Sequence, residues 1–341
     1  MSEVARRAAI AFAVGVLSVA AVVAAATSGG GAGEPDAGVS STDRWRQLRS
    51  SPLERTEVAA ARIGKRIYVV GGFEKPSGET TDAVARYNIK RDRWKLVKPM
   101  PIAANHPAAT SHRGRLYIHG GFTSAGGLSD PSAALSVYNP DRNRWKRLPD
   151  APTPRAAHAL GALDGKLYAA GGANDETEEL TSLEIYDISS RRWTTGSHLS
   201  TGRNHVGGAV VGGRLYVLGG RGAGGMDFNV VERYDPGSDT WETLAPLGVA
   251  RSGFVAVNVR GKAVAYGGEE LTPGGTTIEQ VELYDPETDT WTPLPDMRTP
   301  RHGLGGASRK RRVFALEGGP QPGFAFSRAL EFLDVPKSLG R

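Results

Sequence analysis

The chain has 341 residues, a net charge of +6, 45 glycines, 21 prolines and no cysteine. The lack of cysteine excludes disulfides, thiolate metal ligands and cysteine nucleophiles. Basic residues are spread along the chain without a basic arm or a nucleic-acid motif, so we expect no nucleic-acid partner. The glycine and proline content is typical of many short strands joined by turns.

Residues 1–26 form the most apolar part of the sequence. Arg6 and Arg7 precede residues 8–26, a stretch of 19 residues without a charge. This length favours a hydrophobic helix that stays in the membrane as an anchor. The basic flank and the small residues 24–26 equally fit a cleavable signal peptide. Both alternatives predict an exported protein of the cell envelope, either membrane-anchored or secreted/periplasmic, with residues 27–42 as a glycine-rich flexible linker.

A repeated apolar segment that ends in two glycines organises the rest of the chain. RIYVVGG ends at Gly72, and similar segments end at intervals of 48 to 51 residues, at Gly121, Gly172, Gly220, Gly268 and, in the looser copy RVFALEGG, Gly319. Self-similarity at a fixed period of this size indicates a repeat architecture.

Each unit also carries a tyrosine seven residues before a tryptophan, as in YNIKRDRW with Tyr87 and Trp94. The residues between the two aromatic side chains are typical of a tight hairpin turn. We therefore expect four short antiparallel strands in each unit. The second strand ends at the glycine pair, the third ends at the tyrosine, and the fourth begins at the tryptophan.

The glycine pair, the tyrosine and the tryptophan recur together, and in this respect residues 43–335 resemble kelch-repeat proteins of the exported bacterial type. The resemblance implies an all-β, six-bladed β-propeller of four-stranded antiparallel blades. The last unit stops before a fourth strand, whereas Trp45 precedes the first unit. We therefore expect residues 43–49 to close the ring as the outer strand beside residues 328–334, leaving residues 336–341 as a tail.

The loops that follow the glycine pairs are long and varied, and we call the face that they form the top. Loops of variable sequence on a rigid scaffold are the usual place of binding sites. An arginine lies near the start of five of the units, 16 or 17 residues before the glycine pair, at Arg55, Arg155, Arg203, Arg251 and Arg301. These side chains are either ligands of an anionic or sugar-like molecule at the channel mouth or structural partners of backbone carbonyls.

Four residues that do not repeat from unit to unit are further candidates for binding at the channel mouth: Glu57, His106, His205 and His302. His158 lies nearby in the sequence of the third unit. The histidines show no metal-ligand spacing, so we expect no metal and no cofactor. The catalytic residues, if there are any, are not identifiable from the sequence.

The opposite face, which we call the bottom, carries basic turns in the first three blades and in the last one. If the N-terminus is an anchor, this face could contact an anionic membrane surface. Its basic residues are Arg44, Arg46, Lys90, Arg91, Arg93, Arg142, Arg144, Arg191, Arg192 and the run from Arg309 to Arg312.

Two functions fit these features. The first is an exported binding or scaffolding module that recognises a protein or glycan ligand in the cell envelope through its top loops. The second, implied by the kelch resemblance, is a sugar-active enzyme similar to six-bladed sialic-acid mutarotases. Glu57 and His205 would supply the acid–base pair, and the neighbouring Arg55 and Arg203 would bind the sugar carboxylate. Copper chemistry of the galactose oxidase type needs a cysteine-linked tyrosine, which this chain cannot form.

Overall fold

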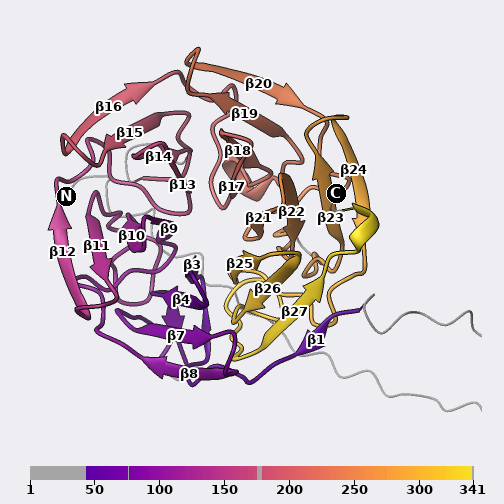
Figure 1. The fold of residues 1–341 in the computed structure, drawn as a ribbon, viewed down its shortest axis with the longest axis horizontal. Helices are drawn as coiled ribbons and strands as arrows, with labels where there is room; N and C mark the ends of the chain where they lie inside the picture. The colour runs from indigo at the N-terminus through magenta and orange to yellow at the C-terminus, as the bar shows by residue number, and fades with distance from the viewer. Residues whose placement is uncertain (1–43, 76, 175–178, 273, 340–341) are drawn as a thin grey trace, which may run out of the picture. The chain divides into compact units, whose positions relative to one another are not determined.

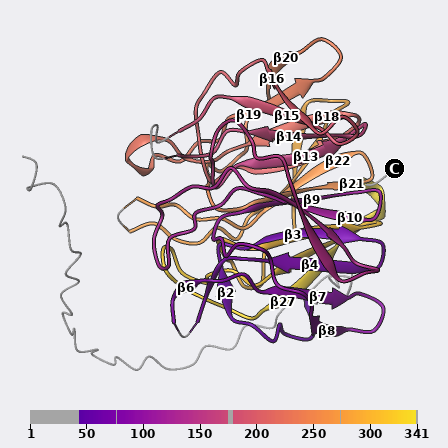
Figure 2. The ribbon, with the colours of Figure 1, turned by 90° about the vertical axis from the view of Figure 1, so that its left-hand side faces the viewer.

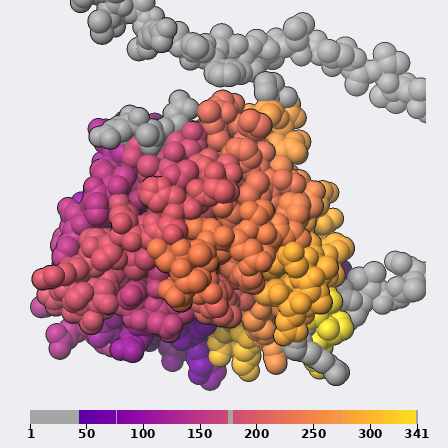
Figure 3. Space-filling view, turned by 90° about the horizontal axis from the view of Figure 1, so that it is seen from above, coloured from indigo at the N-terminus to yellow at the C-terminus, as the bar shows by residue number. Residues whose placement is uncertain are grey.

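The computed structural model describes residues 44–75, 77–174, 179–272 and 274–339. Within these residues, six four-stranded antiparallel sheets follow one another around a ring (Figure 1). In five of the sheets the first strand in sequence lies at the centre of the ring and the last at its rim, whereas in the sixth the rim strand is the first strand of the described chain. Figure 3 views the propeller from the side, where successive blades form successive bands of colour.

The blades have nearly identical strand lengths. Blades 1 to 3 consist of β3 (Ala59–Ile63), β4 (Arg66–Val70), β7 (Val84–Asn88) and β8 (Arg93–Leu96); β9 (Ala108–His112), β10 (Arg115–His119), β11 (Leu135–Asn139) and β12 (Arg144–Leu148); and β13 (Ala159–Leu163), β14 (Lys166–Ala170), β15 (Leu183–Asp187) and β16 (Arg192–Gly196). Blades 4 to 6 consist of β17 (Gly207–Val211), β18 (Arg214–Leu218), β19 (Val231–Asp235) and β20 (Thr240–Leu244); β21 (Val255–Val259), β22 (Lys262–Tyr266), β23 (Val281–Asp285) and β24 (Thr290–Leu294); and β25 (Gly305–Arg309), β26 (Arg312–Leu316), β27 (Leu330–Asp334) and β1 (Arg46–Gln47).

A small sheet of three short strands lies at the top of blade 1, formed by β2 (Arg55–Thr56), β5 (Phe73–Glu74) and β6 (Glu79–Thr80) (Figure 2). The described residues contain two short 3₁₀ helices, η1 (Ala223–Gly225) and η2 (Lys337–Leu339). None of their helices is long and apolar enough to cross a membrane. The predicted hydrophobic helix, residues 1–26, and the predicted linker, residues 27–42, lie outside the described residues.

The ring closes where β1 pairs with β27, with Arg46 opposite Phe332, as the position of Trp45 predicts. The indole of Trp45 is buried and donates a hydrogen bond of 3.0 Å to the carbonyl of Pro295 in blade 5. The other five tryptophans make the same kind of bond to the preceding blade, from Trp94, Trp145, Trp193, Trp241 and Trp291. The repeated tryptophan therefore links each blade to its neighbour.

Small side chains line the central channel because six inner strands converge on it. The channel-facing positions include Ala60, Ala109, Gly161, Gly208, Ala256 and Gly306. A Cβ atom on Gly306 would lie 2.7 Å from a methyl group of Val255 on the neighbouring strand. The glycines here are therefore a packing requirement of the ring.

The register of the last repeat differs from the sequence prediction. Backbone amides of the second glycine in each pair donate to the arginine position of the next blade, and in blade 6 the residue that does so is Gly318, to the Arg55 carbonyl. Glu317, with φ of 57°, occupies the place of the first glycine. The equivalent pair is therefore Glu317–Gly318 rather than Gly318–Gly319. In this register all five arginines precede their pair by 16 residues.

Candidate functional site

The five repeated arginines are fully buried inside the blades and do not line the channel mouth. Arg203 shows the arrangement: its guanidinium pairs with the carboxylate of Glu232 and donates 2.9 Å to the carbonyl of Gly219. The equivalent carboxylates in blades 3, 5 and 6 pair in the same way, in Arg155–Glu184, Arg251–Glu282 and Arg301–Glu331. The geometry corresponds to the structural alternative from the sequence, not to a cationic pocket.

Blades 1 and 2 depart from this pattern in a consistent way. Blade 2 has Ala104 at the arginine position and Ser136 at the glutamate position, so both members of the pair are absent together. Blade 1 has Ala85 at the glutamate position, and Glu317 of blade 6 supplies the carboxylate to Arg55, 2.8 Å from Nε. An unpaired buried charge is strongly destabilising. Accordingly, blade 2 lacks the arginine together with the glutamate, and in blade 1 Glu317 replaces the missing carboxylate.

The residues two positions after the arginine surround the channel mouth. They are Glu57, His106, Ala157, His205, Gly253 and Gly303, and each has a positive φ. Backbone hydrogen bonds connect neighbouring blades at this level, for example from His106 N to the Glu57 carbonyl at 3.0 Å. Non-glycine residues in this conformation are uncommon and cluster at functional sites.

A second set of residues, each directly after a glycine pair in the corrected register, lies beside the first set: Phe73, Phe122, Ala173, Arg221, Glu269 and Gly319. Arg221 and Glu269 from this set join the cluster at the mouth, and the sequence analysis missed both of them. The sequence feature that could have identified them is their position directly after the repeated glycines, because the residue type at this position changes from blade to blade.

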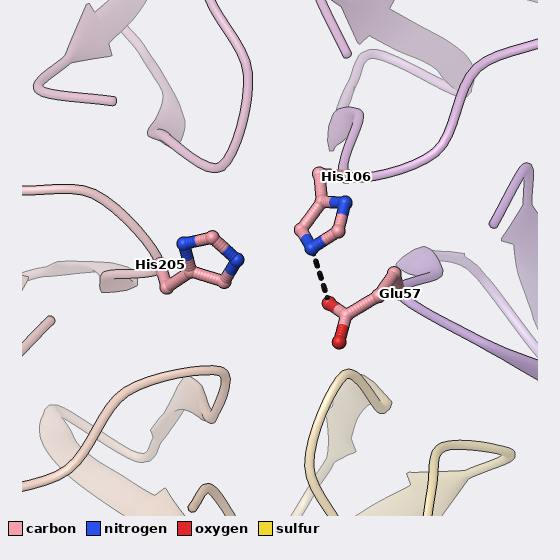
Figure 4. Close-up of side chains that lie close together, drawn as sticks. All are labelled: Glu57, His106 and His205. Atoms are coloured by element: carbon pink, nitrogen blue, oxygen red, sulfur yellow. Dashed lines mark ion pairs between the residues drawn. The ribbon is translucent and has the colours of Figure 1, made fainter. Parts of the chain in front are cut away.

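Six ionisable side chains form a closed circuit around the mouth. Glu57 lies 2.9 Å from His106 Nε2, and the His106 and His205 rings are 4.6 Å apart (Figure 4). Arg221 donates 2.8 Å to His205 Nε2 and contacts Glu269 at 3.2 Å. His302 Nε2 completes the circuit, 3.6 Å from Glu269 and 3.8 Å from Glu57. Three of the predicted histidines and Glu57 are thus brought together.

His106 makes a polar contact through each of its two ring nitrogens. The amide of Asn105 donates to Thr80 Oγ1, which leaves its Oδ1 facing His106 Nδ1 at 2.7 Å. Both ring nitrogens therefore face acceptors, because Nε2 faces Glu57. Burial raises the pKa of Glu57. The charge and hydrogen bond of His106 outweigh that effect, with help from His302 and Arg221, and lower this pKa to about 2.

The hydrogen bonds of His205 differ from those of His106. Its Nδ1 donates a hydrogen bond to Asn204 Oδ1. Its Nε2 therefore carries no proton and accepts a hydrogen bond from Arg221. Burial lowers the pKa of His205 well below its ordinary value, and the charges of Arg221 and His106 lower it further. An imidazole paired with a carboxylate and a neutral imidazole thus lie side by side at the mouth, and groups of these two kinds are used in proton transfer.

The ligand atoms of Glu57, His106 and His205 lie within 4.8 Å of one another, so together they could hold a metal ion. However, His205 Nε2 already accepts a hydrogen bond from Arg221, and the guanidinium charge opposes a cation at this place. The cluster therefore suits an anionic or neutral polar ligand better than a metal.

His158 does not belong to this cluster. It lies one position later in its unit and forms a buried pair with His119, 2.9 Å between His158 Nε2 and His119 Nδ1. Blade 3 instead has Ala157 at the mouth, and Ala173 directly after its glycine pair. The circuit is consequently built from the other five blades.

Comparison with known sequences identifies the repeats. A profile described as the KLHDC2/KLHL20/DRC7 Kelch-repeats domain matches residues 40–201, and the Kelch motif profile matches residues 202–248 and 250–298. The chain belongs to the kelch-repeat family. This confirms the family that the phased glycine, tyrosine and tryptophan positions predicted.

Kelch-like proteins of animals share single repeats with this kelch propeller. Kelch-like protein 21 of Homo sapiens is 43% identical over 54 residues, and Kelch-like ECH-associated protein 1A of Danio rerio is 44% identical over 46 residues. These matches cover 16% and 14% of the chain, and 9% and 8% of those proteins. The matched segment is thus under a tenth of the length of these relatives.

A solved structure titled "Structure of YjhT" is similar to the kelch propeller over most of its length. The TM-score is 0.72, and the match covers 83% of this chain and 95% of that chain. The sequence identity is 17%, so this likeness supports the propeller fold alone.

Proposed function

We propose that this kelch propeller is a binding module that recognises a protein ligand through its top loops. One observation carries the proposal: four large apolar side chains, Leu128, Met226, Leu271 and Phe324, are 40 to 60% exposed, and each comes from a different top loop. Exposed apolar residues that gather on one face are characteristic of interaction sites. The charged circuit at the mouth supplies a polar centre to this apolar rim.

The rim extends to an aromatic group between blades 6 and 1. The ring of Phe324 lies 5.1 Å from Phe73 and 4.8 Å from Phe326, measured between ring centroids. Phe73 in turn contacts His106 edge-on at 6.0 Å. Aromatic side chains near the centre of an interface contribute much of its affinity, so Phe324 is the expected anchor.

A cross-linking capture from the native cell envelope tests this proposal. The test variant replaces Leu128, Met226, Leu271 and Phe324 with serine, and the matched control replaces only Leu96, which is equally exposed on an outer strand. We expect the same protein to be enriched by the wild type and by Leu96→Ser but not by the top-loop variant. Equal enrichment by all three would contradict the proposal.

A second candidate function, catalysis on a sugar, is favoured by His106, which pairs with Glu57, beside the neutral His205. Interconversion of sugar anomers needs a proton donor and a proton acceptor at the ring oxygen and the anomeric hydroxyl, and this pair offers both. Arg221 takes the place that Arg55 and Arg203 have in the sequence hypothesis, as the cation near a sugar carboxylate. The test is an NMR measurement of sialic-acid anomerisation. Acceleration that is lost in Glu57→Gln supports catalysis, and no acceleration removes this candidate.

A further inference from the structure

The bottom turns of four blades share a hydrogen bond that ties them to the preceding blade. The tyrosine hydroxyl donates to a carboxylate or amide oxygen five residues later, and the same oxygen accepts a backbone amide from the neighbouring blade. The four pairs are Tyr87–Asp92, Tyr138–Asn143, Tyr234–Asp239 and Tyr284–Asp289. The amides come from Arg49, Lys98, Ser197 and Ala245.

Blade 3 lacks this acceptor. The residue five positions after Tyr186 is Arg191, which has a φ of 58°, a conformation that favours Asn or Asp over arginine. The hydroxyl of Tyr186 is buried without a hydrogen-bond partner among the described residues. An arginine thus stands where a carboxylate or amide acceptor stands in the other turns, and a buried hydroxyl is left unsatisfied, which is costly.

The same boundary between blades 2 and 3 contains a groove of about 410 Å³. Its apolar lining includes Tyr117, Val137, Leu148 and Ile188. The core between these two blades has four fully buried residues, whereas each of the other core clusters has at least nine. The groove is therefore the place where the packing between adjacent blades is thinnest.

Five cationic side chains surround this apolar lining, and none of the residues that line the groove is a carboxylate. The cations are Arg115, Arg142, Arg144, Lys146 and Arg191. Of these five cations, only Arg115 has an ion pair with another described residue, a contact of 3.5 Å with the exposed Asp141. By contrast, Arg46 and Arg312 of the basic bottom face both pair with Asp334. Four of the five cations at this groove therefore have no ion pair among the described residues.

We propose that the groove between blades 2 and 3 binds an extended acidic segment of another polypeptide. A carboxylate of that segment binds Arg191 and supplies an acceptor where the other blades have their own, while apolar side chains of alternate residues pack on the lining. An extended chain fits a concave groove with an apolar lining, whereas a flat anionic bilayer contacts protruding turns. This site is separate from the top loops and does not depend on their function.

Fluorescence polarisation with the full chain tests the proposal. The probe is a fluorescein-labelled peptide of alternating glutamate and leucine, and the control peptide has glutamine in place of glutamate. We expect binding of the acidic peptide only, weakened at least tenfold by Arg144→Glu. The matched control is Arg93→Glu, the same charge change at the same repeat position in blade 1, which we expect to leave the affinity unchanged.

Arg191→Asp separates binding from folding. The substitution restores the acceptor that the Tyr186 hydroxyl lacks, so we expect the peptide to bind at least tenfold more weakly while the thermal unfolding temperature stays the same or rises. Equal affinities of Arg144→Glu and Arg93→Glu would overturn the proposal. The proposal would also be overturned if the full chain sedimented with phosphatidylserine vesicles and did not bind the acidic peptide. That result would favour a membrane contact instead.

Discussion

The carboxylate of Glu317, directly after strand β26 of the last blade, lies 2.8 Å from the guanidinium of Arg55, at the start of the first blade. Both side chains are fully buried, and Ser51 donates a further hydrogen bond of 2.6 Å to Glu317. The ring is therefore closed by a buried ion pair at the top as well as by the β1–β27 pairing at the rim.

Glu317→Gly, which gives blade 6 the glycine of the other five, is expected to lower the free energy of unfolding. The substitution leaves Arg55 buried without its carboxylate, and breaking such a pair costs about 3 to 5 kcal/mol. Chemical denaturation of the two proteins measures the difference.

The repeat itself provides the rescue. Ala85 lies at the position from which Glu184 of blade 3 reaches its own arginine. The double variant Ala85→Glu/Glu317→Gly is therefore expected to recover most of the lost stability. A double variant no more stable than Glu317→Gly alone would show that the carboxylate cannot be supplied from within blade 1.

The buried pair of His119 and His158 is expected to make stability depend on pH. Burial lowers the pKa of His119 to about 3 and that of His158 well below its ordinary value. The unfolded chain therefore binds more protons than the folded one as the pH falls below about 6.5, so stability decreases on acidification. Between pH 7 and pH 5 the loss due to His119 is about 2 kcal/mol, and His158 adds a loss of the same sign.

Equivalent positions in other blades suggest the variant for this test. Blade 4 has Leu218 and Val206 where the pair has His119 and His158. In His119→Leu/His158→Val, urea unfolding at pH 7 and pH 5 should show a smaller difference than in the wild type. An unchanged difference would mean that other groups carry the acid sensitivity.

Gly303 is expected to be required for the position of Glu57. A Cβ atom at residue 303 would lie 2.5 Å from the Glu57 carboxylate and 2.7 Å from its backbone nitrogen. At Gly253, the matched position of blade 5, the nearest atom is 3.6 Å away. Alanine at residue 253 has only the cost of a positive φ, roughly 1 to 2 kcal/mol, whereas Gly303→Ala adds a steric cost of about 1 to 3 kcal/mol. Equal destabilisation of the two variants would refute the close contact.

Much of the fold is predictable from the sequence because the repeat is marked by residues with fixed structural roles. The glycine pairs allow the backbone to turn with positive φ, and the spacing of Tyr87 and Trp94 places them directly opposite each other in adjacent strands. Trp45, outside the five complete copies, predicts the closing strand. The blade number therefore follows from counting.

The site is harder to predict because a residue that recurs once per blade can point into the blade or into the channel at the same spacing. The sequence alone is compatible with both directions for Arg55 and its equivalents. The structure shows that these side chains point into the blades, where they are fully buried. Arg221 and Glu269 begin the variable loops that follow the glycine pairs, and the loop sequences do not show which of their residues face the mouth. The register of Glu317 was also ambiguous, because two glycines follow it.

The most direct test of the proposed function is hydroxyl-radical footprinting of the propeller with and without the captured partner. The account predicts protection of the top-loop residues Leu128, Met226, Leu271 and Phe324, while Leu96 on the outer strand stays equally reactive. Protection confined to the outer strands or to the bottom turns, with the four top-loop residues unchanged, would contradict it.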